Sequence, residues 1–329
     1  MSRDLTFHGG RIEAAARLYP DAPRPWLDLS TGINPYAWTP PAGLAIDQQR
    51  LPSGEALAGL LAAARAAFGF AGALAAVPGS ELALRLLATL DLPRPWHVVT
   101  PCYRTHRDTL PGAEAIVADR IGEAAARGGT LLLANPNNPD GRLIAPDAVL
   151  SVARTLRPRG GMLIVDEAFA DALAGASVLP LLGANDPVVV LRSFGKFYGL
   201  AGVRLGFVAG AGAVVARIAA LLGDWPVSAT ALAYGAAAYR DVSWAERMRV
   251  RLVTEAVDLD ALLAEHGLVA RGACPLFRLV ACDDVGAVFE RLAAAGVLTR
   301  PFEERPDWLR FGLPGIDFER LAAALAADG

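Results

Sequence analysis

The chain has 329 residues, 53% of them hydrophobic, and its 31 basic and 34 acidic side chains give a net charge of −3. This length favours one large domain with a smaller one beside it. The balanced charge, without a block of lysine or arginine, argues against nucleic acid as a partner, and no apolar run approaches the ~20 residues needed to cross a membrane.

The first residues carry Arg3, Asp4 and His8 and lack the apolar stretch and cleavage site of a secretory signal, which predicts a cytoplasmic protein. The three cysteines form no C-x-x-C pair, so we expect reduced thiols rather than a disulfide framework. The four histidines show no metal-ligand spacing, and we predict no metal. The acidic pair Asp283–Asp284 is better explained as a helix cap.

Secondary structure is predicted from the periodicity along the chain. The segment before about residue 40 is irregular and rich in proline and glycine, which predicts an arm rather than a domain. Alanine-rich stretches such as 56–68 and 319–327 are typical of helices. Further on, short runs of β-branched residues alternate with helical patterns, as in a parallel sheet of βαβ units. The predicted strands are 96–100, 130–134, 162–166, 188–193 and 205–209, and the predicted helices are 80–90, 146–157 and 213–222.

A turn-like segment at 223–227 suggests a domain boundary, because Pro226 follows the run G-D-W. After it come two long helical stretches, strands near 276–280 and 307–312, and a closing helix from 316. The predicted organisation is therefore an arm of residues 1–40, a large domain of residues 41–225 and a small domain of residues 226–329.

Lys196 is the first candidate for chemistry. Lysine is rare in this chain, and this one follows the strand 188–192 in an apolar, glycine-rich loop, at the strand end where α/β sheets place ligands. Burial disfavours the charged ammonium form, which is what an amine that forms a Schiff base requires. A lone loop lysine would ordinarily be a solvated one, so the interpretation depends on its neighbours.

The neighbours of Lys196 can hold a phosphate. Ser193 and Arg204 offer a hydroxyl and a guanidinium to an anion beside the amine. Upstream, the run P-G-S-E contains Gly79, Ser80 and Glu81 and opens a helix, whose free backbone N–H groups would add a cradle. Taken alone, such a glycine-serine turn is more often a plain helix cap.

Three further residues follow strand ends. Asp166 ends the run M-L-I-V-D, where a carboxylate can pair with a protonated pyridine nitrogen or simply cap a helix. Asn138, in N-P-N-N-P-D-G, is placed to donate to a phenolic oxygen. Tyr103, in T-P-C-Y, is placed to stack on a ring, although an isolated tyrosine is more often packing.

In this order and spacing, G-S-E, P-C-Y, N-P-N-N-P-x-G, V-D-E-A-F and S-F-G-K…G-V-R-L-G resemble the class I/II aminotransferase superfamily of pyridoxal-phosphate (PLP) enzymes. The resemblance covers nearly the whole chain and implies an α/β fold: a PLP-dependent transferase-like large domain with a mostly parallel sheet, plus a smaller α+β C-terminal domain. It implies that Lys196 carries PLP as a Schiff base, that Asp166 pairs with the ring nitrogen and that Asn138 binds the phenolic oxygen. It also gives the other roles: Tyr103 stacks on the ring, Ser80, Glu81 (by its backbone), Ser193 and Arg204 hold the phosphate, and Arg310 clamps the substrate α-carboxylate.

The arm narrows the resemblance. The runs F-H-G-G and D-L-S-T-G-I-N-P are similar to the arm of the threonine-phosphate decarboxylases of cobalamin synthesis, which convert L-threonine O-3-phosphate to (R)-1-amino-2-propanol O-2-phosphate. The open alternatives are an aminotransferase for histidinol phosphate or a related amino acid, and a binding or regulatory module that keeps the fold. On the main interpretation the substrate is a small phosphorylated amino acid, and a second anion site is expected at Arg300, with His8 and Asn34 of the arm closing over it.

Two positions depart from the superfamily pattern. Phe169 stands three residues after Asp166, where many relatives have a tyrosine that reaches the cofactor's phenolic oxygen. Leu51–Pro52 stands where many relatives have a Tyr-Pro pair, whose tyrosine reaches the cofactor phosphate of the neighbouring subunit. A homodimer is still expected, because active sites of the family lie between subunits.

Overall fold

The computed structural model describes residues 5–6 and 8–327, so Arg3 and Asp4 of the predicted arm lie outside the described residues. The chain forms two compact units. The larger contains 37–138 and 142–248, and the smaller contains the described residues before 37 together with 139–141 and those from 249 onward. The predicted domain boundaries at residues 40 and 225 stay a prediction.

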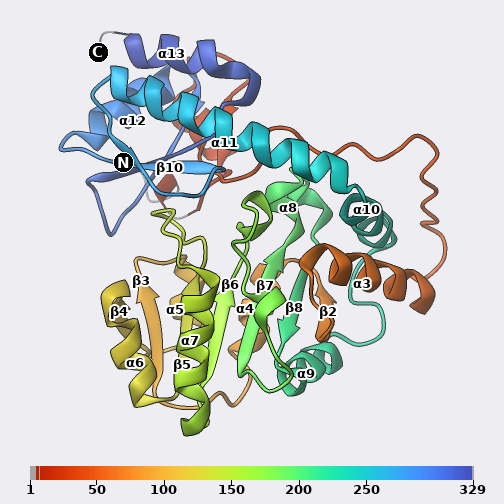
Figure 1. The fold of residues 1–329 in the computed structure, drawn as a ribbon. Helices are drawn as coiled ribbons and strands as arrows, with labels where there is room; N and C mark the ends of the chain where they lie inside the picture. Colours follow the sequence, from red (N-terminus) through yellow and green to blue (C-terminus); the bar gives the residue numbers. More distant parts are fainter. Residues whose placement is uncertain (1–4, 7, 328–329) are drawn as a thin grey trace. The chain divides into compact units, whose positions relative to one another are not determined.

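The larger unit is built on one seven-stranded sheet (Figure 1). Six strands run parallel and only β8 runs antiparallel to both of its neighbours, so the sheet is mostly parallel as predicted. In spatial order the strands are β2 (Ala73–Val77), β8 (Gly206–Gly210), β7 (Val188–Ser193), β6 (Met162–Asp166), β5 (Thr130–Ala134), β3 (Trp96–Thr100) and β4 (Glu114–Val117).

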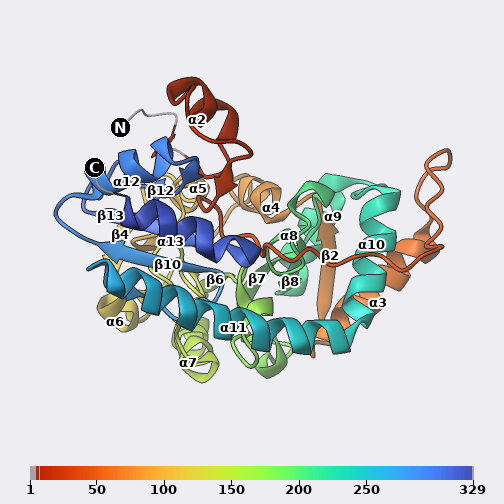
Figure 2. The ribbon, with the colours of Figure 1, turned by 90° about the horizontal axis from the view of Figure 1, so that it is seen from above.

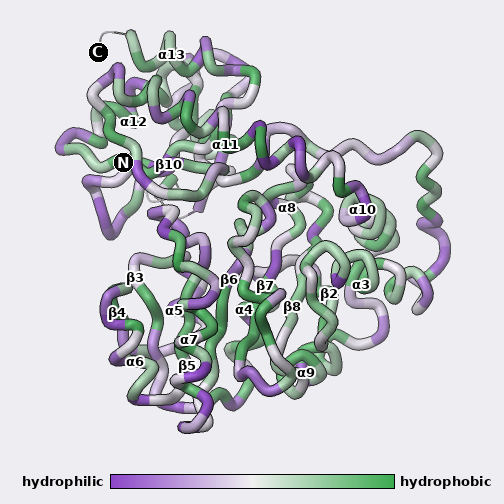
Figure 3. The backbone as a smooth tube through the Cα atoms, viewed as in Figure 1, coloured by the Kyte–Doolittle hydropathy of each residue, from purple (hydrophilic) through white to green (hydrophobic). Residues whose placement is uncertain are grey.

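The five predicted strands of this sheet are confirmed to within one residue. These strands could be predicted from the sequence because the central strands are mostly hydrophobic, as Figure 3 shows. The prediction did not include β2 or β4. The sequence of β2 is Ala-Leu-Ala-Ala-Val, and alanine has little preference for strands. The edge strand β4 is four residues long and mostly exposed.

Helices cover both faces of the large sheet (Figures 1 and 2). One face is covered by α4 (Ser80–Leu87), α5 (Arg104–Thr109) and α9 (Gly212–Leu222), and the other by α6 (Ile121–Arg127) and α7 (Pro146–Leu156). The helices α3 (Gly54–Phe68) and α10 (Ala229–Arg240) pack together near β2, and the short α8 (Phe194–Phe197) follows β7. The predicted helices are confirmed, with α4 ending three residues earlier than expected.

Local sequence explains where individual helices begin and end. The Ser53 side chain caps the first turn of α3, and Gly69 ends that helix in the left-handed conformation. At α12 (Val285–Ala294) the Oδ1 atom of Asp284 accepts a hydrogen bond from the amide of Ala287 at 3.0 Å. The predicted capping role of the Asp283–Asp284 pair is therefore confirmed at Asp284.

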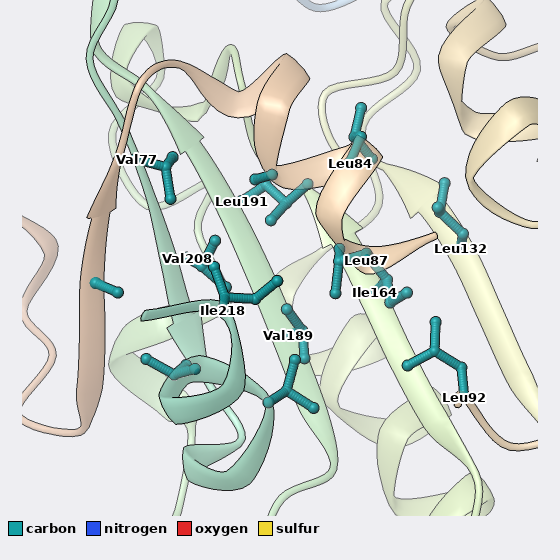
Figure 4. Packing of buried hydrophobic residues seen from close by; sticks show 14 of the residues in the cluster. Val77, Leu84, Leu87, Leu92, Leu132, Ile164, Val189, Leu191, Val208 and Ile218 are labelled. Carbon is teal, nitrogen blue, oxygen red and sulfur yellow. The ribbon is translucent and has the colours of Figure 1, made fainter. Parts of the chain in front are cut away.

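The core beneath α4 and α9 fixes which side chains share a face of the sheet. Val189 and Leu191 of β7 and Ile164 of β6 pack in one buried cluster with leucines of α4 and Ile218 of α9 (Figure 4). Side chains two residues apart on a strand point to the same face. Ser193 and Asp166, at the ends of these strands, therefore stand on the face that α4 covers.

The smaller unit is an α+β assembly around a four-stranded antiparallel sheet, in the order β12 (Arg300–Pro301), β13 (Trp308–Gly312), β10 (Phe277–Ala281) and β9 (Ala270–Arg271). In a second small sheet, β1 (Leu27–Asp28) pairs in parallel with β11 (Val297–Leu298). Its helices are α2 (Ile12–Leu18), α12, α13 (Phe318–Ala326) and the C-terminal part of α11 (Val242–Glu265), within which the division between the units falls. The strands predicted near 276–280 and 307–312 and the closing helix are confirmed within two residues, whereas α2 in the arm was not expected.

Six single turns of 3-10 helix complete the described secondary structure. They are η1 (Ala118–Arg120), η2 (Arg157–Arg159), η3 (Ala170–Ala172), η4 (Leu179–Leu181), η5 (Ala201–Val203) and η6 (Gly315–Asp317). Within the described part of the chain, none of the helices has the length and apolar character that crossing a bilayer requires.

Candidate active site

The predicted cofactor residues of the larger unit stand at one edge of its sheet. Because β2, β3, β5, β6 and β7 run parallel, their carboxyl ends meet at that edge, and the antiparallel β8 begins there. Each predicted residue follows one of these ends or precedes β8. They are Gly79, Ser80 and Glu81 after β2, Tyr103 after β3, Asn138 after β5, Asp166 in β6, Ser193 and Lys196 at the end of β7, and Arg204 before β8.

The beginning of α4 forms a tight cradle with Arg204. Gly79 precedes α4 with φ of 89°, and a Cβ atom at this position would lie 2.6 Å from Nη2 of Arg204. A Cβ atom on Gly206 would lie 2.7 Å from the amide nitrogen of Ser80. Arg204 itself adopts a left-handed φ of 55°, which is uncommon for a residue with a side chain. The two glycines thus allow Arg204 and the start of β8 to pack directly against the first turn of α4. This brings a guanidinium beside the N–H groups of a helix N-terminus, an arrangement that fits a phosphate.

Lys196 lies in α8, directly beyond β7, and is half-buried. Its Nζ atom stands 5.9 Å from the centre of the Phe169 ring. The turn that carries it is closely packed, because a Cβ atom on Gly195 would lie 2.6 Å from Cα of Ala201. Lys196 is also the only lysine in the sequence. An aldehyde cofactor therefore finds a single side-chain amine in this chain.

Asp166 makes two kinds of contact. The interpretation of Asp166 as a helix cap is wrong, because β6 is followed only by the 3-10 turn η3, whose N-cap residue is Phe169. The Oδ1 atom of Asp166 instead accepts a hydrogen bond from the amide of Ala168 at 3.1 Å, within the turn that follows the strand. Its Oδ2 atom lies 2.9 Å from Nε2 of His106, a ring buried on α5. The carboxylate is therefore held at both oxygens and is 6% exposed.

His106 is a site residue that the sequence reasoning missed. Burial lowers the pKa of its ring, but the hydrogen bond to Asp166 and the contact with Cys102 together raise the pKa to about 9. Near neutral pH the ring is therefore a cation paired with Asp166. The available signal was its spacing, three residues after Tyr103, which places both rings on neighbouring positions of one helical turn; their centres lie 5.8 Å apart, edge to face.

Tyr103 stands at the N-cap position of α5. Burial raises the pKa of its hydroxyl to about 12, and the negative charge of Glu81 adds to the shift. The phenol therefore stays protonated over the whole physiological range. The Oγ1 atom of Thr105 donates to Glu81 at 3.1 Å, which ties the start of α5 to the start of α4.

The loop that contains Asn138 is fixed to its neighbours by asparagine amides. Asn135 exchanges two hydrogen bonds with the backbone of Ile144, at 2.8 and 2.9 Å, and closes the loop on itself. Asn137 donates to the carbonyl of Pro101 at 2.9 Å, and the amide of Asn135 donates to the carbonyl of Asp166 at 2.9 Å. Half-buried Asn138 is thus carried by a loop that is anchored to the strands on both sides.

A buried ion network stands on the opposite face of the same strand ends. Arg192, one residue before Ser193, donates to Glu167 at 2.9 Å and also contacts Asp171. Glu167, one residue after Asp166, accepts further hydrogen bonds from Ser177 at 2.5 Å and from the amide of Val178 at 2.7 Å. The network joins the ends of β6 and β7, which carry Asp166 and Ser193. This network was not predicted, because nothing in the run V-D-E-A-F indicates that Glu167 pairs with Arg192.

The four predicted substrate residues lie in the smaller unit. Arg300 of β12 and Arg310 of β13 stand directly opposite each other in the antiparallel register and are 9% and 5% exposed. Nη2 of Arg310 donates to the carbonyl of Ser30 at 2.7 Å. Asn34 is buried, with Oδ1 accepting from the amide of Tyr36 at 2.9 Å, and His8 is half-buried. The roles predicted for these four residues, and for the nine in the larger unit, stay predictions.

Residues 108–327 match the family model described as "Aminotransferase class I and II". A relative from Sinorhizobium sp., named threonine-phosphate decarboxylase, is 39% identical over 99% of this chain and 99% of its own length. A relative of the same name from Pseudomonas aeruginosa is 38% identical over 97% of this chain and 96% of its own. Relatives named histidinol-phosphate aminotransferase share 30–34% over 58–76% of this chain.

The fold is also found among solved structures. A crystal structure described as histidinol-phosphate aminotransferase from Sinorhizobium meliloti in complex with pyridoxal-5'-phosphate has a TM-score of 0.82 to this chain. It covers 95% of this chain, which covers 92% of that one, at 20% identity. At this identity the likeness concerns the fold, and it agrees with the predicted α/β architecture.

Proposed function

Because the chain belongs to the aminotransferase class I and II family, we propose that it is a PLP-dependent decarboxylase of L-threonine O-3-phosphate, with (R)-1-amino-2-propanol O-2-phosphate as product. One observation carries the proposal: similarity to two relatives named threonine-phosphate decarboxylase runs over 97–99% of this chain. Similarity to the histidinol-phosphate aminotransferases is weaker and covers less of the chain.

The residues of the larger unit fit the cofactor. PLP, when bound, supplies a ring that withdraws electrons from the substrate carbon next to the amine. The Asp166 carboxylate favours a protonated ring nitrogen. His106 holds that carboxylate in place through the contact between its Nε2 atom and Oδ2 of Asp166. Tyr103 stacks on the ring and Asn138 donates to its phenolic oxygen. The amide groups of Ser80 and Glu81, the Ser193 hydroxyl and the Arg204 guanidinium hold the phosphate.

The two arginines of the smaller unit suit a substrate with two anionic groups. Like charges directly opposite each other in an antiparallel sheet repel, and a bound anion reduces that repulsion. Arg310 binds the α-carboxylate through a forked contact, and Arg300 binds the phosphate together with His8 and Asn34. Decarboxylation then requires that the carboxylate be held so that the bond to the departing CO2 stands perpendicular to the plane of the electron-withdrawing ring. Only then can the electrons of that bond overlap with the π system of the ring.

Lys196 has two tasks in this proposal. Its amine would hold the cofactor covalently in the absence of substrate. When the cofactor is bound to the substrate instead, Lys196 would carry the proton that the substrate ammonium gives up, and as an ammonium it can act as an acid. When the bond between the substrate carbon and its carboxylate breaks and CO2 leaves, the electron pair stays on the substrate carbon, and the Lys196 ammonium would give that carbon a proton.

The reaction is tested by incubating the PLP-loaded enzyme with L-threonine O-3-phosphate alone. We expect CO2 and the amine phosphate in equal amounts, without any requirement for a 2-oxo acid. Failure to release CO2, together with transfer of an amino group from histidinol phosphate to 2-oxoglutarate, would instead identify an aminotransferase. Binding of PLP without any spectral change on adding amino acids would identify a non-catalytic module.

Arg300 is tested by comparing two substrates. Arg300→Ala should weaken binding of threonine phosphate by about tenfold or more, which is the worth of one charge-assisted contact. Binding of plain threonine should change much less, since it lacks the phosphate. An equal loss for both would remove the phosphate assignment from Arg300.

We also propose that the enzyme is a cytoplasmic homodimer. The dimer is supported by family membership, since active sites of the family lie between subunits, although Leu51–Pro52 replaces the Tyr-Pro pair that commonly reaches across. Light scattering on the PLP-loaded protein should give about twice the 34.4 kDa of one chain. Cell fractionation should recover the protein with cytoplasmic markers.

A further inference from the structure

The H-G-G run packs against one residue of the arm, Ser30. A Cβ atom on Gly9 would lie 2.3 Å from the carbonyl oxygen of Ser30 and 2.8 Å from its carbonyl carbon, so no side chain fits at this position. Gly10 has φ of 77°, and its amide donates to Oγ of Ser30 at 2.7 Å. Only glycine allows this close approach together with this backbone conformation.

Ser30 is fixed from a second direction by Asp28. Oδ1 of Asp28 accepts hydrogen bonds from both the amide of Ser30, at 2.9 Å, and its hydroxyl, at 2.5 Å. Ser30 is 3% exposed, so these contacts are shielded from water. The peptide unit of Ser30 therefore has little freedom to rotate while Gly9, Gly10 and Asp28 hold it.

The held carbonyl is the one that contacts Arg310. Nη2 of Arg310 donates to the oxygen of Ser30 at 2.7 Å. The strand that carries Arg310 is tied to the same segment, because the amide of Gly312 donates to the carbonyl of Leu29 at 2.7 Å. A Cβ atom on Gly312 would lie 2.4 Å from the carbonyl oxygen of Thr31. Both the backbone and the guanidinium of the β13 segment are thus positioned by residues 29–31.

We propose that the H-G-G run is a buttress for the carboxylate clamp. Gly9 and Gly10 fix the peptide of Ser30, whose carbonyl orients the guanidinium of Arg310 toward the substrate carboxylate. Gly9, Gly10 and Ser30 are positioning residues that act through Arg310. The inference rests on the proposed function in one respect, that Arg310 binds the carboxylate. The two glycines of the H-G-G run thereby favour ligands that carry a carboxylate over ligands that lack one. This role is separate from any contact that His8 makes.

The test compares two ligands that lack an amine and so cannot react with the cofactor. One is 3-phosphooxybutanoate, with a carboxylate and a phosphate, and the other is 2-propyl phosphate, with the phosphate alone. Their dissociation constants for the PLP-loaded enzyme are measured by calorimetry. In Gly9→Ala the added methyl group displaces the Ser30 carbonyl, so we expect the first ligand to bind about tenfold more weakly and the second to bind as before. Equal weakening of both ligands would overturn the proposal.

Gly267→Ala is the matched control. It adds the same methyl group in the same unit at a glycine with φ of 74° and nothing within 4 Å, so it introduces backbone strain without touching Ser30. The ratio of the two dissociation constants should not change. If Gly9→Ala does not fold, Ser30→Ala is used instead. This change removes the hydroxyl that accepts a hydrogen bond from the Gly10 amide and donates one to Asp28, but it keeps the Ser30 carbonyl. It should shift the ratio in the same direction, and an unchanged ratio would count against the buttress.

Arg310→Ala separates the test of the carboxylate clamp from the test of the buttress. If it lowers affinity for 3-phosphooxybutanoate and spares 2-propyl phosphate, the clamp stands, and the glycine variants then decide the buttress. If it affects both ligands equally, the carboxylate clamp of the proposed function is wrong, and the buttress is overturned with it.

Discussion

In the larger unit each predicted cofactor residue lies within a few positions of the strand that carries it, and opposite charges meet in buried pairs. In the smaller unit the arm near the start of the chain meets a strand near its end, and two arginines stand opposite each other. On the proposed function the first arrangement holds a permanent cofactor, and its buried pairs should contribute strongly to folding. On the same proposal the second binds a substrate that comes and goes, so its variants should change selectivity more than stability.

The largest effect is expected at Lys196. Lys196→Ala removes the amine that attaches the cofactor and donates a proton, so turnover should fall by at least about 10²–10⁴-fold. Because Lys196 is the only lysine in the sequence, borohydride reduction of the wild-type holoenzyme should label one lysine per chain, detected by mass spectrometry. A wild-type holoenzyme in which borohydride labels no lysine, or a Lys196→Ala variant that keeps wild-type turnover, would contradict the assignment.

The next effect is on stability. Arg192→Ala leaves the carboxylates of Glu167 and Asp171 buried without their guanidinium, which should lower the free energy of unfolding by about 3–5 kcal/mol. Urea unfolding followed by circular dichroism measures it. Arg120→Ala, which breaks an exposed pair with Glu123, is the control and should cause no measurable change. A small loss at Arg192 would break the comparison, because the strand ends would then not depend on their ion network.

Sequence reasoning succeeded in the larger unit for a physical reason. Parallel strands buried on both faces are nearly continuous hydrophobic runs rich in valine, isoleucine and leucine. A motif that follows such a run can be assigned to the end of that strand, where α/β sheets place ligands. It found Asp166 and Ser193 in this way but missed Glu167 and Arg192, their neighbours on the other face. Which distant side chains meet on a face depends on the order of strands in the sheet, which a single sequence does not reveal.

The smaller unit was less readable. Arg310 was recognised by resemblance alone, and its position opposite Arg300 follows from an antiparallel register that periodicity cannot fix. The contact between Ser30 and Arg310 joins residues 280 positions apart. The H-G-G run could be recognised as unusual from the sequence, but its contact with Ser30 could not. A glycine indicates that another group packs closely against the backbone, and it does not indicate which group that is.

A third test uses the pH dependence of stability at His106. Its pKa in the folded protein, about 9, lies above the ordinary value of 6.5, so the protonated ring stabilises the fold. This contribution is fully present below about pH 6.5 and is lost as the pH rises through about 9. The stability difference between wild type and His106→Gln, from urea unfolding across this range, should therefore be largest at acid pH and shrink toward pH 9.

His97 on β3 is the matched control with the opposite sign. Burial and the nearby Arg127 lower its pKa below 6.5, so the folded state resists protonation that the unfolded state accepts. The wild type should therefore lose stability as the pH falls through 6.5, and His97→Gln should remove that loss. Parallel pH profiles for the two variants would show that the pair with Asp166 does not raise the pKa of His106.

The smallest expected effect concerns Phe169, which is 5% exposed and has its ring near Nζ of Lys196. Phe169→Tyr would restore the hydroxyl that many relatives carry and give the cofactor's phenolic oxygen a second donor besides Asn138. A hydrogen bond to a charged group is worth about 1.5–3 kcal/mol, so the pH midpoint of the bound cofactor's absorbance change should fall by about one to two units. The dissociation constants of the two phosphate ligands should stay as they are, because the change lies in the larger unit. A shift in ligand selectivity with an unchanged midpoint would mean that position 169 serves the substrate, and the division of labour between the two units would not hold there.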